Sequence, residues 1–269
     1  MRTDKVLLVF KKDWLEIRRN WEILAPILIV PLIFSVFLPS VIMLIPAGAS
    51  TNGDVSGILG ILPANVRAEI AGFTEQQTVV YLLLGYLFLP FFLIIPAMAS
   101  SVIASDSFAG EKERKTIEGL LATPLSDAEL MMGKILVAFV PSMIVTLASF
   151  ITYTAIVDYL GFGLFGRLIL PTINWVLVIF LLSPAVSVAG IALTVIVSAR
   201  VKGFREAQQL SVLIIVPIMG LVVGQAFGIL LLVPVVILIL TALFAAIDVV
   251  ILKIGLSMFE REEILSRIH

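Results

Sequence analysis

Side chains that could carry covalent or metal chemistry are scarce in this chain of 269 residues. Cysteine is absent, which excludes disulfides and thiolate chemistry, and the single histidine, His269, is the last residue. An enzyme that works within a lipid bilayer needs a nucleophile with a base, or a metal cage. Because the residues for such a site are lacking, we predict no catalytic residue and no metal ligand in this chain.

Gly110 and, five residues later, Lys115 and Thr116 resemble part of a phosphate-binding loop. The second glycine of that motif is missing, and no hydrophobic strand precedes the segment to place backbone amides around a phosphate. We therefore predict that this chain does not bind or hydrolyse ATP by itself, and that any ATPase is a different chain.

Two kinds of polar group interrupt otherwise apolar segments. Four side chains share one helix face because they step by four, three and four residues: Ser142, Thr146, Ser149 and Tyr153. They are candidates to line a translocation path, or they bond across helix contacts, which is the more frequent role of such groups. Asp248 is a possible intramembrane acid, but Lys253 about one turn away favours a paired or snorkelling carboxylate.

A dense run of charge lies within residues 105–134. We expect it to begin as a helical extension in which Glu111 pairs with Lys115 and Arg114 with Glu118, at i,i+4 spacing. This cluster either contacts a partner or is a solvated face that only fixes the topology.

The residues after this cluster predict a short amphipathic helix. Ile117, Leu120 and Leu121 form its apolar face, and Pro124 ends it, because the residue before a proline avoids the helical region. Ser126 and Glu129 then have the spacing of a capping box, which opens the next helix. A short helix held between two rigid segments suits a lever that another protein pushes.

The composition identifies the solvent of the surrounding elements as lipid. Hydrophobic residues make up 60% and charged residues only 14% of the chain, whereas a soluble domain has about 25% charged residues. Three stretches lack any charge, 23–53, 76–105 and 168–199, and each exceeds the roughly 20 apolar residues that cross a bilayer. The sequence predicts an all-α polytopic membrane protein.

We predict six transmembrane helices. The uncharged stretch 207–247 is too long for one crossing, so it must fold back, with Gly224 to Gly228 as the turn. The small-residue spacing of Gly220, Gly224 and Gly228 suits either a dimer contact or this turn. The predicted spans are 23–46, 78–104, 135–157, 169–198, 207–223 and 229–252.

Residues 5–21 predict an N-terminal amphipathic helix. Its apolar residues recur at steps of three or four: Val6, Phe10, Trp14, Ile17 and Trp21. The remaining surface carries Lys11, Lys12, Asp13, Arg18 and Arg19. A basic helix with two tryptophans suits the headgroup layer, and the alternative is a soluble helix that packs on a partner.

The basic residues predict the orientation. With six spans, only Arg67 and Arg167 lie on one side of the membrane, and the other basic residues share the side of both termini. We therefore expect a multi-pass protein of the plasma or inner membrane with both termini in the cytoplasm.

Thr116 to Ser126, Thr-Ile-Glu-Gly-Leu-Leu-Ala-Thr-Pro-Leu-Ser, follows the charged cluster directly after the second of the six predicted spans. This arrangement resembles the membrane subunit of ABC-2 type (ATP-binding-cassette) transporters, and the resemblance covers the whole topology, with an elbow helix at 5–21 and a coupling loop at 105–134. It implies that a coupling helix docks on a separate cytoplasmic ATPase. The implied coupling residues are Glu111, Lys112, Glu113, Arg114, Lys115, Thr116, Ile117, Glu118, Leu120, Leu121, Thr123 and Pro124.

The resemblance also implies an exporter that works by alternating access, with two permease chains as a homodimer or heterodimer. This chain would hold no cofactor, because ATP and Mg would be bound by the partner ATPase. Nothing in the charge points to nucleic acid as a partner. The alternative function is an ATP-independent channel or secondary transporter. The sequence does not identify the transported substrate.

Overall fold

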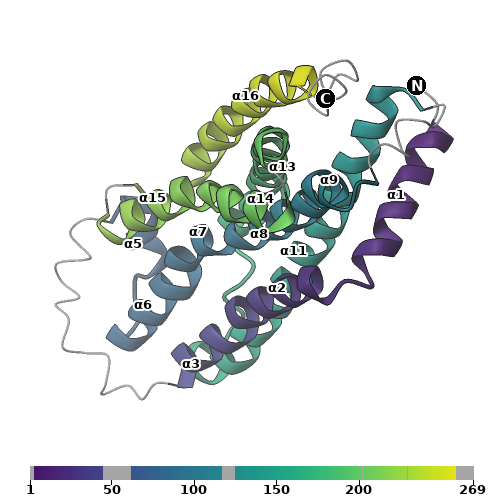
Figure 1. Ribbon diagram of the computed structural model, residues 1–269. Coiled ribbons are helices and arrows are strands. Elements are labelled where there is room, and N and C mark those ends of the chain that lie inside the picture. Colours follow the sequence, from purple (N-terminus) through teal and green to yellow (C-terminus); the bar gives the residue numbers. More distant parts are fainter. Residues whose placement is uncertain (1–2, 45–61, 117–124, 202, 229, 259–269) are drawn as a thin grey trace.

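The computed structural model describes residues 3–44, 62–116, 125–201, 203–228 and 230–258, and in these residues every regular element is a helix (Figure 1). Six of the helices are long and apolar enough to cross a membrane. The prediction of an all-α protein with six spans is confirmed.

Proline and π-helical turns divide three of the spans into shorter helices. Span 1 consists of α2 (Trp21–Leu32), η1 (Ile33–Phe37) and α3 (Leu38–Leu44). Span 2 consists of α6 (Glu75–Leu82), η2 (Leu83–Leu87), α7 (Phe88–Phe92), α8 (Ile94–Ser105), η3 (Asp106–Gly110) and α9 (Glu111–Glu113). Span 4 consists of α12 (Ile173–Leu177), η4 (Val178–Leu182) and α13 (Ser183–Arg200).

The other spans are more continuous. Span 3 is the single helix α11 (Asp127–Phe165), and span 6 is α16 (Pro234–Met258). Span 5 consists of α14 (Phe204–Ser211), the short 3-10 turn η5 (Val212–Ile214) and α15 (Ile215–Ala226). Outside the spans lie α1 (Thr3–Ile17) and α5 (Ala64–Glu69).

Spans 2 and 3 are longer than predicted, and at the α1 end of the bundle both extend toward the 105–134 loop. Span 2 continues to Glu113, and α11 begins at Asp127 behind the predicted capping box of Ser126 and Glu129, which is confirmed. The fold-back of the fifth and sixth spans also falls in the predicted segment, since α15 ends at Ala226 and Gly228 has a φ of 67°. In Figure 1, α1 lies beside α11 at this extended end, and α5, α6 and the end of α15 lie at the opposite end.

Three consecutive backbone carbonyls of η2 form a hub for the bundle. Pro90 has no N–H to give to the carbonyl of Tyr86, and the π-helical turn shifts the backbone bonding, since the N–H of Phe88 bonds the carbonyl of Leu83. Side chains of spans 3, 4 and 5 bond the three carbonyls, so span 2 is joined to all three spans. The donors are Tyr153 Oη to Leu84 O at 2.8 Å, Trp175 Nε1 to Gly85 O at 3.0 Å and Gln225 Nε2 to Tyr86 O at 2.6 Å.

Aromatic rings surround this carbonyl hub. The rings of Tyr153 and Trp175 stack with centroids 4.7 Å apart, and Phe92 meets Trp175 edge-on at 5.2 Å. Trp175 and Tyr153 are among the largest fully buried side chains of the described residues. Because lipid cannot satisfy a free carbonyl, these buried donors stabilise a break in span 2 that would otherwise be costly.

The buried face of α1 agrees only in part with the predicted one: Val6 and Ile17 are buried, but Phe10 and Trp14 are only partly buried. The structure buries Val6, Val9, Asp13 and Ile17 against the bundle, whereas Leu7 and Leu8 are exposed. The sequence pattern had placed Asp13 on the polar surface, and that assignment is wrong. Asp13 follows Val9 by four residues and precedes Ile17 by four, so all three share the face that packs on α11. Trp21 lies on α2 and is exposed.

Candidate functional site

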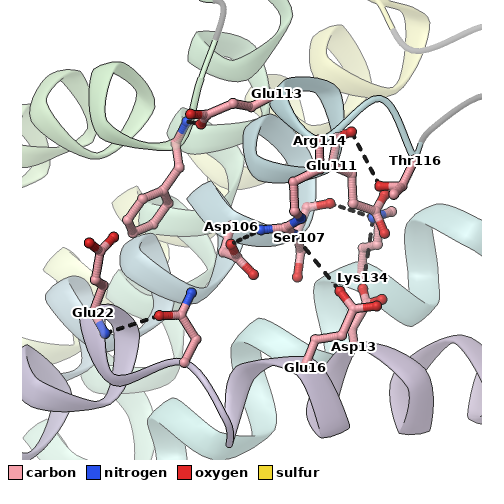
Figure 2. Close-up of polar contacts among 12 residues, drawn as sticks. Asp13, Glu16, Glu22, Asp106, Ser107, Glu111, Glu113, Arg114, Thr116 and Lys134 are labelled. Carbon is pink, nitrogen blue, oxygen red and sulfur yellow. Dashed lines mark hydrogen bonds and ion pairs between the residues drawn. The ribbon is translucent and has the colours of Figure 1, made fainter.

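Glu111 is the centre of a buried charge cluster where span 2 ends. Its side chain belongs to the short helix α9 and is 1% exposed. Lys12 Nζ of α1 lies 2.5 Å from Oε1 of Glu111, and Lys134 Nζ of α11 lies 2.5 Å from Oε2. Lys134 also donates to the carbonyl of Ser107. The two carboxylate oxygens of Glu111 therefore connect α1 and α11 through span 2. Figure 2 shows Glu111 beside Lys134 of α11 and Asp13 of α1.

Asp13 is the second acid of this cluster. It is 3% exposed, and its carboxylate lies 3.2 Å from Lys12 Nζ and 3.7 Å from Lys134 Nζ. We call Lys12, Asp13, Glu111 and Lys134 the charge cluster. With two acids and two bases its formal charge is zero, which is the condition under which buried charges are tolerated.

The pKa values on α1 reflect this balance. Burial raises the pKa of the Asp13 carboxyl above its ordinary value, although the charge of Lys134 opposes the shift. Burial lowers the pKa of Lys12, but the hydrogen bond to Glu111 and the charges of Asp13 and Glu111 outweigh it, so the net shift is upward. The raised pKa of Lys12 favours its charged form. The raised pKa of Asp13 disfavours its ionised form.

The neighbours of Glu111 connect the same segment to spans 4 and 5. Lys112 Nζ donates to the carbonyl of Val201 at 3.0 Å, just past the end of α13. The carboxylate of Glu113 accepts from the backbone N–H of Phe204 at 2.8 Å, at the first residue of α14. An acid at a helix N-terminus is favoured by the unpaired N–H groups and the helix dipole. A Cβ at Gly203 would lie 2.7 Å from Glu113 Oε2, so a side chain there would displace this carboxylate.

Arg114 and Lys115 end the helix. Arg114 bonds Asp106 Oδ1 at 2.8 Å and lies 3.8 Å from Glu16 of α1. Lys115 has a φ of 56°, a left-handed conformation that closes α9, and the N–H of Thr116 bonds the carbonyl of Glu111. The expected i,i+4 pair of Glu111 with Lys115 does not form, because the helix stops at Glu113 and Glu111 turns toward α1 and α11 instead.

The predicted coupling residues thus divide into three groups. Glu111 is buried. Lys112, Glu113, Arg114, Lys115 and Thr116 are exposed at the end of the bundle, although the first three also have partners within the chain. The third group lies outside the described residues: Ile117, Glu118, Leu120, Leu121, Thr123 and Pro124. Their role in docking stays a prediction.

The four hydroxyl residues of α11 lie on a buried face, as their spacing indicated. Tyr153 donates to the carbonyl hub, and Ser142 Oγ lies 2.9 Å from Ser187 Oγ of span 4. Thr146 and Ser149 donate to carbonyls one turn back in their own helix. Each hydroxyl therefore bonds within this chain, those of Ser142 and Tyr153 across helix contacts, and the translocation path stays a prediction.

Asp248 belongs to α16, which packs against α13. Its side chain is 4% exposed and, within the described ranges, Oδ1 has no hydrogen-bond partner. No ion pair with Lys253 forms among those residues, so local pairing does not account for this acid.

Sequence reasoning missed Lys12, Asp13 and Lys134 as site residues. A usable signal was present: Asp13 occupies an apolar position of α1, and Lys134 lies in the first turns of a membrane span. Charges at positions that must be buried are expected to pair. The partners themselves were not deducible, because Lys12 and Glu111 are 99 residues apart.

A family comparison agrees with this architecture. The sequence model of the family described as ABC-2 family transporter protein matches residues 7–237, which include most of α1, the charge cluster and the first five spans. A search of curated proteins found no match. Family membership implies a place in the membrane and an ABC ATPase as partner. The chain belongs to the ABC-2 transporter family and is a multi-pass membrane subunit of an ABC transporter.

Proposed function

We propose that this chain is the permease of an ATP-driven exporter, and that the charge cluster transmits movement from the ATPase to the spans. The observation that carries the proposal is the position of Glu111. It lies within a few residues of the predicted docking segment 117–124 and is bonded to both α1 and α11. With Lys112 and Glu113 bonded near α13 and α14, a force on this segment reaches spans 2 to 5.

The proposed mechanism is alternating access. A permease of this kind works as a pair of chains, either identical or different, each with an ATPase that binds ATP and Mg. Hydrolysis in the ATPase would move the α1 end of each bundle, and the hub would carry the movement across the membrane. This chain itself contributes no ATPase site.

The orientation is part of the proposal. Basic residues gather at the α1 end, whereas Arg67 and Arg167 lie at the other, and this asymmetry supports a cytoplasmic α1 end in a plasma or inner membrane. Because the chain has no cysteine, single cysteines can report this. An impermeant maleimide on intact cells should label Arg167→Cys and leave Lys115→Cys unlabelled until the membrane is opened. The reverse labelling would refute the orientation.

Partnership through the predicted segment can be tested by co-purification with the ABC ATPase. A chain with Glu111, Glu113 and Arg114 all changed to alanine should lose permease-dependent ATP turnover. The matched control changes Glu22 and Arg205 to alanine, because this ion pair is exposed, with side chains 62% and 80% accessible. If the triple variant retains both the bound ATPase and full turnover, the coupling assignment is wrong.

A further inference from the structure

A groove lies where α1 packs on α11, near the start of span 3. The two helices are closest at Gly133, since a Cβ there would lie 2.6 Å from Cβ of Val9. Beside this contact is a space of about 390 Å³ between the two helices, which we call the α1 groove. Its walls are apolar except for one threonine: Thr3, Val6, Leu7 and Phe10 of α1, and Met132, Leu136 and Val140 of α11.

The α1 groove continues into the outer surface of span 3. Leu136 and Val140 are one helical turn apart, and the next residue in this row, Ile144, is 61% exposed. Ile151, about two turns further along α11, is 67% exposed. Because α11 is a membrane span, apolar side chains on its outer surface face the acyl chains of the bilayer. The groove is therefore continuous with a surface that lipid covers, and an acyl chain is the occupant that this continuity favours.

The charged groups beside the groove are mainly positive. Lys11 follows Leu7 by four residues, so it continues the row of α1 that lines the groove. Arg18 and Arg19 follow at the end of the helix, and all three basic side chains are exposed. Among the described residues none of the three forms an ion pair, and Asp4 is the one acid of α1 of which the same is true. Three unpaired bases and one unpaired acid favour an anionic headgroup.

We propose that the α1 groove binds one anionic phospholipid, with an acyl chain between α1 and α11 and the phosphate at Lys11. The chain packs against the apolar walls, and Arg18 and Arg19 add to the attraction of the headgroup. The next residue after Lys11 is Lys12, whose ammonium bonds Glu111. The lipid is thus held by the helix that also carries part of the charge cluster. The proposal depends on the membrane location of the chain and not on its ATPase partner, so its test needs the permease alone.

Photo-crosslinking can locate such a lipid. The full-length chain is reconstituted in nanodiscs of phosphatidylcholine with a small fraction of phosphatidylglycerol that carries a diazirine at the end of one acyl chain. The comparison probe has the same diazirine chain and a phosphatidylcholine headgroup, and mass spectrometry locates the adducts. The anionic probe should label the lining residues of α1 and α11 about 5-fold more than the choline probe, or better. Equal labelling by the two probes would overturn the proposal, and so would the absence of adducts in the groove, as expected if a second permease chain covers it.

Two variants with matched controls separate the headgroup contact from the chain contact. Lys11→Gln should lower the preference for the anionic probe about 5-fold, the contribution expected of one lysine at an anionic surface, and leave labelling by the choline probe unchanged. Its control is Lys253→Gln, which removes an exposed lysine near the end of α16. Val140→Phe fills the groove and should reduce labelling by both probes, whereas Ile144→Phe, one turn further along the same row and outside the groove, should not. If Lys11→Gln and Val140→Phe are labelled like their controls, the proposal is wrong.

Discussion

Two regions of this bundle join its helices by different chemistry. At the α1 end, the charge cluster connects α1, span 2 and α11 with ion pairs. Within the membrane, the carbonyl hub connects spans 2 to 5 with neutral donors alone. Ionised groups are costly in hydrocarbon, whereas a neutral donor to a freed carbonyl removes a penalty that the bilayer imposes.

This difference assigns the two regions different tasks. A neutral hydrogen bond inside lipid has no competitor, so the hub is suited to hold the spans in one arrangement. The charge cluster lies next to exposed residues and to the predicted docking segment, where a partner's charges can compete. It is the region where an external force can change the packing.

The largest effect should come from leaving the charge cluster unbalanced. Lys134→Met removes the base that bonds Glu111 and approaches Asp13, so two buried acids share Lys12 alone. We expect the chain to lose about 3–5 kcal/mol of stability, measured as a lower melting temperature of the purified protein.

The double variant Lys134→Met with Glu111→Met is its control. Removing an acid and a base together restores the balance of charge, so most of the stability should return. A double variant as unstable as Lys134→Met would show that size and not charge matters at Lys134.

A smaller loss of stability is expected when α1 is displaced from its packing against α11. A Cβ at Gly133 would lie 2.6 Å from Cβ of Val9, which is too close for either backbone to keep its place. Gly133→Ala should destabilise by about 1–3 kcal/mol and increase proteolysis of α1. Val9→Ala should partly rescue it. Gly163→Ala in the same helix is the control, because nothing lies within 4 Å of its Cβ.

The hub should respond more mildly to the loss of one donor. Tyr153→Phe keeps the ring packing but leaves the carbonyl of Leu84 without this hydrogen bond, at a cost of about 1 kcal/mol. The melting temperature should fall slightly. Tyr159→Phe is the comparison, because Tyr159 is exposed on the same helix. If both variants melt alike, the hub bond contributes little.

The smallest effect is expected for the exposed pair of Arg205 and Glu22. Both side chains are largely solvated, and such pairs contribute about 0–1 kcal/mol. Arg205→Ala should leave the melting temperature nearly unchanged. A loss as large as that of Lys134→Met would remove the distinction between buried and surface ion pairs on which the comparison depends.

The sequence was sufficient to predict the number and approximate positions of the spans, because the length of an apolar run directly reflects bilayer thickness. The capping box of Ser126 and Glu129 was also predictable, since its partners are three residues apart. The hub was not, because its donors lie 69 to 139 residues from their acceptors and depend on where a π-helical turn frees carbonyls. Glu111 was recognised as a polar site residue, but its burial depends on the approach of α1, which the amphipathic pattern did not place correctly.

The most direct test of the account asks whether ATP at the α1 end changes the opposite end through Glu111. A single cysteine at Phe227, exposed just past α15, carries an environment-sensitive dye in the reconstituted complex with the ABC ATPase. Adding ATP and Mg should change the dye fluorescence in the parent chain and in the control Glu22→Gln, and not in Glu111→Gln with the ATPase still bound. An unchanged response in Glu111→Gln would contradict transmission through the charge cluster.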